Sequence, residues 1–380
     1  MKFKLFLLIL LCSKIHLTFA QINNEGLEQS IQISDSNESK VMLALETQNF
    51  FKNNEYFHDI STGYTLMGTQ WKTSIAYQIS PYIRIQGGVF LQQDFGHNPF
   101  HLVQPIFSLK ASKHGYSMLF GSLESNLSHK LLDPILSYER NILTPIENGI
   151  QLKVDRKNIW SDTWMNWEKM QYLGDSSQEK FTVGHSSQIH VLKKKSFSVD
   201  FPIQFLVTHR GGQIDIDTTA LQTIMNFAAG FKLRKMCKGF IKEIQTENYA
   251  LWYKDFSPTK RWPYGEGNAF FLNATIRTKF DISASLGYWQ GFQYLASRGG
   301  YLFQSAAFEY GTKGYTESSR KLCFIRLLYQ HQLLQHLYAD VRFEPYIDLG
   351  KQFFEYSYSF YLTYKNDFNL INLKKSKKVF

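Results

Sequence analysis

Charged residues of this sequence gather on one side of segments in which apolar residues recur at every second position. Since successive residues of a β-strand point to opposite faces, these charges would lie on the polar faces of such strands and could line an aqueous passage. Six are basic and six are acidic, which predicts weak charge selectivity. The lumen-lining candidates are Arg84, Asp200, Lys232, Arg234, Glu243, Glu247, Arg277, Asp281, Arg326, Asp340, Arg342 and Glu344.

Two arrangements of the arginines are open. Arg84, Arg326 and Arg342 could form a local basic wall if closure of a sheet brings their strands towards one another. Alternatively, Arg326 and Arg342 could pair with wall carboxylates such as Asp340 and Glu344, which would leave no net basic patch.

The segment from Glu124 to Ile146 is a candidate constriction. Its central stretch, LSHKLLDPILSYER, combines apolar residues that could pack against a wall with charged residues that could face water. Asp133 precedes a proline that could start or break a short helix, and Glu139 and Arg140 complete the constriction-loop candidates. The alternative is an ordinary external loop.

A further candidate is a row of residues suited to binding a sugar. Trp160, Asp162, Trp164 and Asn166 would share one face of a strand. On a lumen face, the tryptophans could stack on a sugar ring while the amide and carboxylate bind its hydroxyls. On a lipid face Asp162 would be badly placed. A third interpretation puts Trp164 or Trp167 in the aromatic girdle at a membrane interface.

Familiar catalytic motifs are missing from the sequence. It contains no G-x-S-x-G, no H-E-x-x-H, no paired-cysteine metal site and no phosphate-cradling glycine loop. The histidines are scattered, and Cys237 and Cys323 lack metal-ligand spacing. The sequence therefore predicts that the protein is not an enzyme and needs neither a metal nor a cofactor.

Strands predicted from the alternation must position these residues. From Phe354 to Tyr364 every second residue is apolar or aromatic, with Ser357, Ser359 and Thr363 between them. A strand of this length suits a bilayer crossing, whereas strands of soluble sandwiches are usually about half as long. About sixteen such segments follow one another along the chain.

The connections between these segments alternate in length. Short ones lie near residues 80–81, 112–115, 155–158, 193–196, 236–239, 279 and 332–335, and long ones near 52–63, 94–99, 124–146, 168–179, 210–221, 254–267 and 292–320. Only the last, near Gly350, is short where a long one is due. Outer-membrane barrels have short periplasmic turns and long outer loops, whereas a secreted all-β sandwich, the alternative, has no reason to separate loop lengths. The predicted fold class is all-β, a transmembrane antiparallel up-and-down β-barrel of about 16 strands (14–18).

The ends of the chain predict export and flexible flanks. Residues 1–20 read as a signal peptide, with Lys2 and Lys4 before a short apolar stretch and a small-residue cleavage pattern. Residues 21–40 are predicted to be a flexible periplasmic segment, 41–366 the barrel, and 367–380 a basic tail or a late closing strand. The net charge of +10 falls to +7 without the three lysines of the signal, so nucleic acid is not an implied partner.

With its signal peptide, strand number, loop alternation and aromatic last strand near the terminal Phe380, the chain resembles porin-type bacterial outer-membrane β-barrel proteins. The resemblance covers the mature chain and rests on architecture, without a family-specific motif. One departure is that such barrels end their last strand at the terminal aromatic residue, whereas Asn366 to Phe380 continue past it here.

The resemblance implies a multi-pass barrel in a bacterial outer membrane, in contact with lipid and lipopolysaccharide, with the third outer loop folded into the lumen. It implies a channel for passive diffusion of small polar solutes, since sixteen strands enclose a lumen wider than wall side chains fill. The alternative is a non-conducting barrel that acts as scaffold, surface receptor or secretion accessory through its long loops. A homotrimer or a surface partner protein is compatible with either function.

Overall fold

The chain forms one closed antiparallel barrel of sixteen strands, which confirms the predicted fold class. The computed structural model describes residues 24, 26–97, 99–124 and 126–373, so the predicted signal peptide lies outside the described residues. The strands are β1 Lys40–His58, β2 Ser61–Ser80, β3 Ile83–Asp94, β4 Leu102–Lys113, β5 Tyr116–Ser122, β6 Asn148–Arg156, β7 Ile159–Lys169, β8 Glu179–Lys193, β9 Phe197–Gly211, β10 Gln222–Met236, β11 Ile241–Asp255, β12 Glu266–Thr278, β13 Ile282–Phe292, β14 Ser319–Leu334, β15 Leu337–Asp348 and β16 Phe353–Asn372. The described helices are short: η2 Asp35–Asn37, η3 Asn126–His129, α1 Arg140–Leu143 and η4 Tyr301–Phe303.

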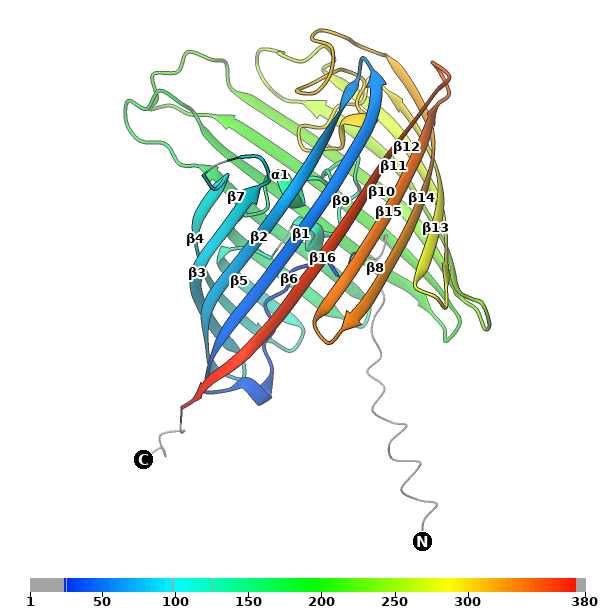
Figure 1. Cartoon of the computed structure of the whole chain (residues 1–380). Coiled ribbons are helices and arrows are strands. Elements are labelled where there is room, and N and C mark those ends of the chain that lie inside the picture. Colours follow the sequence, from blue (N-terminus) through cyan, green and yellow to red (C-terminus); the bar gives the residue numbers. More distant parts are fainter. Residues whose placement is uncertain (1–23, 25, 98, 125, 374–380) are drawn as a thin grey trace.

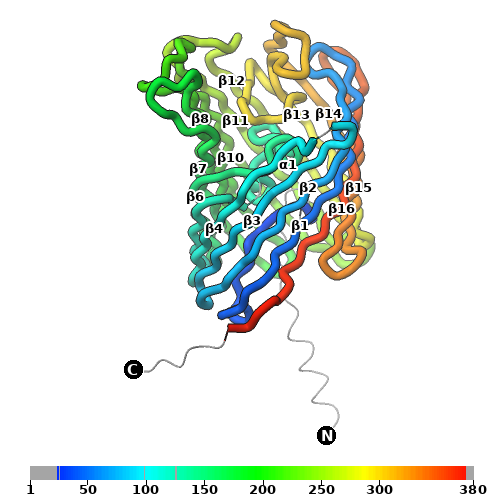
Figure 2. The backbone as a smooth tube through the Cα atoms, turned by 60° about the vertical axis from the view of Figure 1, so that its left-hand side comes forward, coloured from blue at the N-terminus to red at the C-terminus, as the bar shows by residue number. Residues whose placement is uncertain are grey.

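Each strand pairs with its neighbours in the sequence, and β1 pairs with β16 to close the barrel. The strands are strongly tilted, and most of the long connections project from one end (Figure 1). Viewed from another side, the barrel wall encloses further segments of the chain, among them α1 (Figure 2). In the part of the chain that the structure describes, no helix is long and apolar enough to cross a membrane.

The alternation of residue types decides which face of each strand points outward. In β9, Phe201 exposes 46% of its surface, whereas its neighbour Asp200 exposes 2%. The same contrast holds in β10 between Phe231, which is exposed, and Lys232, which is buried. Apolar side chains therefore form the outer, lipid-facing surface and polar ones face the interior, as the bilayer requires of a barrel.

The first hairpin differs from the prediction of a long connection near residues 52–63. β1 continues to His58 and β2 begins at Ser61, so only two residues join them. Strand pairing persists there, with Glu55 opposite Tyr356 and His58 opposite Ser61. The stretch KNNEYFHD is polar because these strands extend past the apolar belt, and its composition alone resembles that of a loop.

The N-terminal segment also differs from its prediction as a flexible periplasmic element. Leu27 is fully buried and packs with Phe50 and Tyr361 of the barrel wall. The Ile31 amide donates to Glu124 Oε1 over 2.9 Å. Apolar side chains and backbone hydrogen bonds thus hold part of residues 26–34 inside the lumen, because the interior offers them matching partners.

At the other end of the chain, β16 continues to Asn372. It stays paired with β1 along this stretch, and the final pair is Lys40 opposite Asn372. The first six residues of the predicted tail, 367–372, therefore belong to the closing strand. The rest of the tail from residue 374 onward, including its four lysines, lies outside the described residues.

A large apolar cluster lies within the barrel. It joins inward-facing residues of the wall, such as Trp289 and Phe324, to Ile135 of the segment between β5 and β6 and to Leu295 and Phe303 of the connection between β13 and β14. Two outer connections thus fold into the lumen and bury apolar side chains there. This interior packing stabilises the arrangement by the same hydrophobic effect as a globular core.

Candidate functional site

The segment between β5 and β6, residues 123–147, is held inside the barrel by a buried histidine. His129 Nδ1 lies 2.9 Å from Asp162 Oδ2, and its Nε2 lies 2.8 Å from Glu147 Oε2. The ring stacks on Trp164 with centroids 3.6 Å apart. Burial alone would lower the pKa of His129, but Asp162 and Glu147 outweigh it and raise the pKa to about 9. His129 is therefore an imidazolium at neutral pH, with both nitrogens occupied.

A second anchor of the same segment is Glu124. Its carboxylate accepts from Lys110 Nζ at 2.7 Å and from Lys153 Nζ at 2.5 Å. Burial would raise the pKa of Glu124, but the two lysines lower it well below its ordinary value. The carboxylate bridges β4 and β6 and, through the Ile31 amide, the N-terminal segment.

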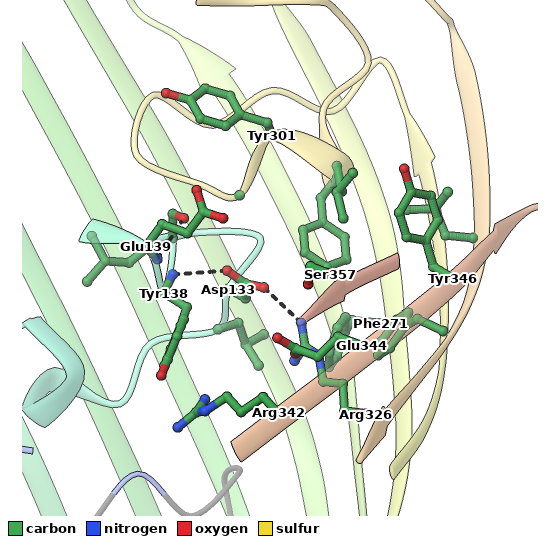
Figure 3. A pocket seen from close by; sticks show the side chains of 18 of the residues that line it. Asp133, Tyr138, Glu139, Phe271, Tyr301, Arg326, Arg342, Glu344, Tyr346 and Ser357 are labelled. Atoms are coloured by element: carbon green, nitrogen blue, oxygen red, sulfur yellow. Dashed lines mark hydrogen bonds and ion pairs between the residues drawn. The ribbon is translucent and has the colours of Figure 1, made fainter. Parts of the chain in front are cut away.

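The tip of the segment borders a cavity of about 140 Å³ inside the barrel. Figure 3 shows Asp133 directed at Arg326, whose guanidinium lies 2.8 Å from Asp133 and 3.0 Å from Glu344. Glu139 accepts hydrogen bonds from Tyr64 and from Asn54. Phe271, Phe303 and Phe324 line the apolar side of the same cavity.

The charges around this cavity mostly satisfy one another. Lys52 lies 3.4 Å from Glu139, and Arg342 lies 3.4 Å from Asp340 and over the ring of Tyr138. Burial raises the pKa of Asp133, and Arg326 opposes that shift. Groups engaged in this way position the segment and could accept an amphipathic ligand.

The structure places the constriction candidates on this segment in different ways. Asp133 and Glu139 line the cavity, whereas Arg140 begins α1 and does not border the cavity. Burial and the nearby Arg298 lower the pKa of Arg140 to about 10.

The lumen candidates also divide into those that face the interior and one that does not. Arg84 pairs with Asp367, Lys232 lies 3.2 Å from Glu247, and Arg234 donates to Ser198 over 3.2 Å. Asp281 is different, because it lies in the turn before β13 with a φ of 60° and is exposed. The inward-facing candidates are Arg84, Asp200, Lys232, Arg234, Glu243, Glu247, Arg277, Arg326, Asp340, Arg342 and Glu344.

The row of Trp160, Asp162, Trp164 and Asn166 faces the interior and is buried. His129 covers the face of Trp164, and Lys130 lies over Trp160 at 4.9 Å from its centroid. The tryptophan faces predicted to stack on a sugar are thus covered by the infolded segment. The order of residues in one strand could not indicate this contact.

The interior of the barrel is partly filled by the chain itself. Inward-facing Lys232, Gln204 and Glu247 expose only 1%, 2% and 3% of their surfaces. Wall side chains alone would not fill a barrel of this size, and segments 26–34, 123–147 and 293–318 occupy part of the space, with cavities left beside the first two of these segments.

A polar cluster at the outer ends of β1, β2 and β16 contains the residue types of a hydrolase triad, His58, Ser61 and Glu355. Its geometry does not fit that role. An Arg320 guanidinium nitrogen lies 2.7 Å from His58 Nε2, and the Glu355 carboxylate lies 3.3 Å from Nδ1. With both ring nitrogens engaged, the ring cannot take a proton from Ser61.

Two hydroxyl–imidazole pairs lie on the outward face of the barrel. His209 Nδ1 of β9 is 2.9 Å from Thr223 Oγ1 of β10, and His185 Nδ1 of β8 is 2.7 Å from Thr163 Oγ1 of β7. Such a contact is the usual arrangement of a nucleophile and its base. Sequence motifs missed both pairs because each is made across neighbouring strands. The hairpin register, which puts Thr223 opposite His209, was the signal that could have found one.

A family model described as lipid A 3'-O-deacylase-type matches residues 33–373. The chain belongs to this family. Because the lipid A 3'-O-deacylase-type family is one of enzymes, the prediction that the protein is not an enzyme is wrong. That prediction depended on contiguous motifs, which residues brought together across strands do not produce. Family and closed barrel together place the protein among outer-membrane barrels.

Solved structures share the barrel at low sequence identity. A loop-deletion mutant of the outer membrane protein OmpT of Vibrio cholerae has 9% identity and a TM-score of 0.52, over 85% of this chain and 99% of that chain. The in-vitro folded trimer form of OmpT has 7% identity and a TM-score of 0.50, over 86% and 100%. OccAB2 of Acinetobacter baumannii has 12% identity and a TM-score of 0.49, over 88% and 100%. Identities this low show the fold alone. No curated protein sequence matches the chain.

Proposed function

We propose that this protein hydrolyses an acyl ester of an acylated glycolipid in the outer leaflet, the reaction after which its family is named. The family match over residues 33–373 carries the proposal. Two features of the barrel support it. The interior is packed with the chain's own segments, which leaves the outward wall as the surface that membrane lipid reaches, and hydroxyl–imidazole pairs lie on that wall.

The reaction adds water across the bond between an acyl carbonyl carbon and a sugar oxygen. It releases one fatty acid and leaves a free hydroxyl on the sugar, and it requires a nucleophile and access of water.

Incubation of the purified protein with lipopolysaccharide in mixed micelles tests the proposal. We expect mass spectrometry to show time-dependent loss of one ester-linked acyl chain from lipid A, with the matching free fatty acid in solution. Heat-unfolded protein is the control. Intact lipid A after prolonged incubation with folded protein would overturn the proposal.

Passive diffusion of small hydrophilic solutes with weak charge selectivity is the second candidate. The observation in its favour is the charged lining of the interior cavity, where Lys52, Arg326 and Glu344 face one another. It requires segments 26–34, 123–147 and 293–318 to leave a continuous aqueous path through the lumen. Stepwise ohmic currents in planar bilayers, with reversal potentials near zero in a KCl gradient, would support it. A folded barrel that resists heat in SDS but carries no current would exclude it.

A further inference from the structure

We propose that the lumen of the barrel contains a binding groove for an extended peptide, and that segment 26–34 occupies this groove as a removable plug. Release of the plug joins two cavities inside the barrel into one aqueous passage. The inference is independent of the proposed hydrolysis, and it names the element that controls the passage of small polar solutes.

The two cavities reach opposite ends of the barrel. The first, of about 140 Å³, extends to Ser61 in the outer hairpin of β1 and β2 and is bordered by Asn24. The second, of about 470 Å³, extends to His336 in the short turn between β14 and β15 and is bordered by residues 28–32. The described N-terminal chain thus runs from one cavity to the other and lies between them.

Side chains of the segment alternate between the groove and the second cavity. Leu27 and Ile31 are buried, whereas Ser30 and Gln32 are exposed and border that cavity. Ser34, the last residue, has an extended backbone with a φ of −139° and a ψ of 138°. Leu27 packs in the small apolar cluster of the wall and Ile31 in the large apolar cluster of the lumen. The groove therefore offers two apolar subsites four residues apart.

The groove also binds the main chain of the segment. Five of its carbonyls accept hydrogen bonds from side chains of the lumen. Lys365 donates to the carbonyl of Glu28 over 2.6 Å, Ser128 to that of Gln29 over 2.8 Å, Lys110 to that of Ile31 over 2.7 Å, Arg84 to that of Gln32 over 3.0 Å and Gln78 to that of Ser34 over 2.7 Å. Three donors are cations, which strengthens these bonds. Main-chain hydrogen bonds combined with pockets for particular side chains are how proteins recognise extended peptides.

Segment 26–34 is attached less firmly than segment 123–147, which shares the lumen with it. Segment 123–147 continues into a strand at each end, β5 and β6, and its buried His129 lies between two carboxylates. In the described part of the chain, segment 26–34 continues into the wall only through β1. Of the two segments, 26–34 is therefore the one that can leave without unfolding the barrel.

The cations of the groove keep partners when the segment leaves. Lys110 Nζ also lies 2.7 Å from Glu124, and Arg84 is paired with Asp367. Water that enters the joined cavities can replace the carbonyl acceptors, since the net gain from one such hydrogen bond is small. Release thus leaves neither cation buried without a counter-charge, and burial of Leu27 is the main contribution that opposes it.

Close packing at Gly26 shows how tightly the groove fits the segment. A Cβ added at this position would lie 2.6 Å from Asp340 Oδ2 and 3.2 Å from the Cβ of Tyr338 on β15. The carboxylate can rotate away, but the Tyr338 Cβ is fixed to its strand. A larger side chain at position 26 should therefore displace the segment and leave the wall unchanged.

Planar-bilayer recordings of full-length variants test the plug. Leu27→Asp combined with Ile31→Asp puts a carboxylate into each apolar subsite and should raise the fraction of time spent conducting at least about 100-fold over the unsubstituted protein. Gly26→Leu should open the passage by steric exclusion alone. Ser30→Asp is the matched control, because it adds the same charge at an exposed position of the same segment, and it should stay within about 2-fold of the unsubstituted protein.

A synthetic peptide of residues 26–34 tests the groove. Added to both chambers with the double variant, it should reduce the current in a concentration-dependent way, because it takes the place of the substituted segment. A control peptide with Leu27→Ser and Ile31→Ser keeps the main chain without the apolar side chains and should reduce the current far less.

The outcomes separate the plug, the groove and solute diffusion. Equal currents in the unsubstituted protein, the double variant and Gly26→Leu, all with heat-modifiable migration in SDS, would overturn the plug. If those equal currents are large, passive diffusion stands without a plug, and if none flows, both fail. A conducting double variant whose current the peptide does not reduce would overturn the groove as a peptide-binding site. The proposed hydrolysis is unaffected by any of these results.

Discussion

Two histidines on opposite sides of the same wall, His129 inside and His209 outside, differ in what their ring nitrogens contact. Both nitrogens of His129 face carboxylates within 2.9 Å, and the ring is fully buried against Trp164. His209 contacts a hydroxyl through Nδ1 and remains partly exposed on the lipid-facing side.

The difference separates a histidine that anchors an internal segment from one on the outer wall. A charged imidazolium between two carboxylates is electrostatically satisfied and costs much to disturb, because its partners are buried with it. The interior of this barrel thus anchors segment 123–147, whereas the outer wall carries hydroxyl–imidazole pairs among lipid-facing residues.

The largest expected effect on stability is at the interior histidine. His129→Leu leaves Asp162 and Glu147 buried without their shared partner, and we expect the free energy of unfolding to fall by about 3–5 kcal/mol. Urea unfolding in detergent micelles, followed by tryptophan fluorescence, measures the change. His209→Asn is the matched control and should cost under about 1 kcal/mol. Equal losses in the two variants would remove the distinction between the histidines.

A second test concerns the tip of the infolded segment. Arg326→Met removes the cation shared by Asp133 and Glu344, so two largely buried carboxylates lose their partner. We expect a loss of about 2–3 kcal/mol in the same unfolding experiment, with faster hydrogen exchange in residues 131–139. The control Lys254→Met breaks an exposed ion pair with Glu266 and should change nothing measurable. Unchanged exchange in Arg326→Met would show that the tip is held by apolar packing alone.

The sequence predicted most of the barrel because strand period and loop length are local signals. The alternation from Phe354 to Tyr364 marks β16, and all but the first long connection lies close to where it was expected. The exception is the long connection predicted at residues 52–63. That prediction failed because β1 and β2 extend past the membrane, where polar residues continue a strand without an apolar face. The prediction that Asp281 lines the lumen failed for the opposite reason, since a turn residue next to an alternating strand continues the alternation in the sequence.

The candidate sites were less predictable because they depend on contacts between distant residues. The position of Asp133 in the infolded segment gave no indication that Arg326 would contact it, since the two residues are 193 positions apart. His129 was one scattered histidine until the fold put it beside Asp162. His209 and Thr223 are 14 residues apart, and only the exact hairpin register brings them together.

An effect of similar size is expected from pH. The pKa of His129 is raised from 6.5 to about 9 in the folded protein, so its stabilising contribution is complete below pH 6.5 and is lost as the pH rises through 9. Lys130 changes stability in the opposite direction with pH. Burial lowers its pKa to about 8, so the folded protein becomes more stable as the pH rises above 8. The difference in unfolding free energy between the unsubstituted protein and His129→Gln isolates the histidine, and it should shrink by roughly 2–3 kcal/mol between pH 7 and pH 10. A difference that stays constant over this range would mean that His129 is not charged at neutral pH.

The smallest effect is expected at the outward pair in the middle of the wall. Thr163→Val combined with His185→Leu replaces two polar side chains that face lipid chains, and a lipid-exposed position accepts apolar residues at least as well as polar ones. The unfolding free energy should therefore change by less than about 1 kcal/mol, and deacylation should be unaffected. Unheated SDS gels of membranes extracted in mild detergent extend the test, because a homotrimer that used this face would lose its trimer band in the double variant. Loss of that band with an intact monomer would show that Thr163 and His185 contact a second copy of the chain, whereas an unchanged band leaves them facing lipid.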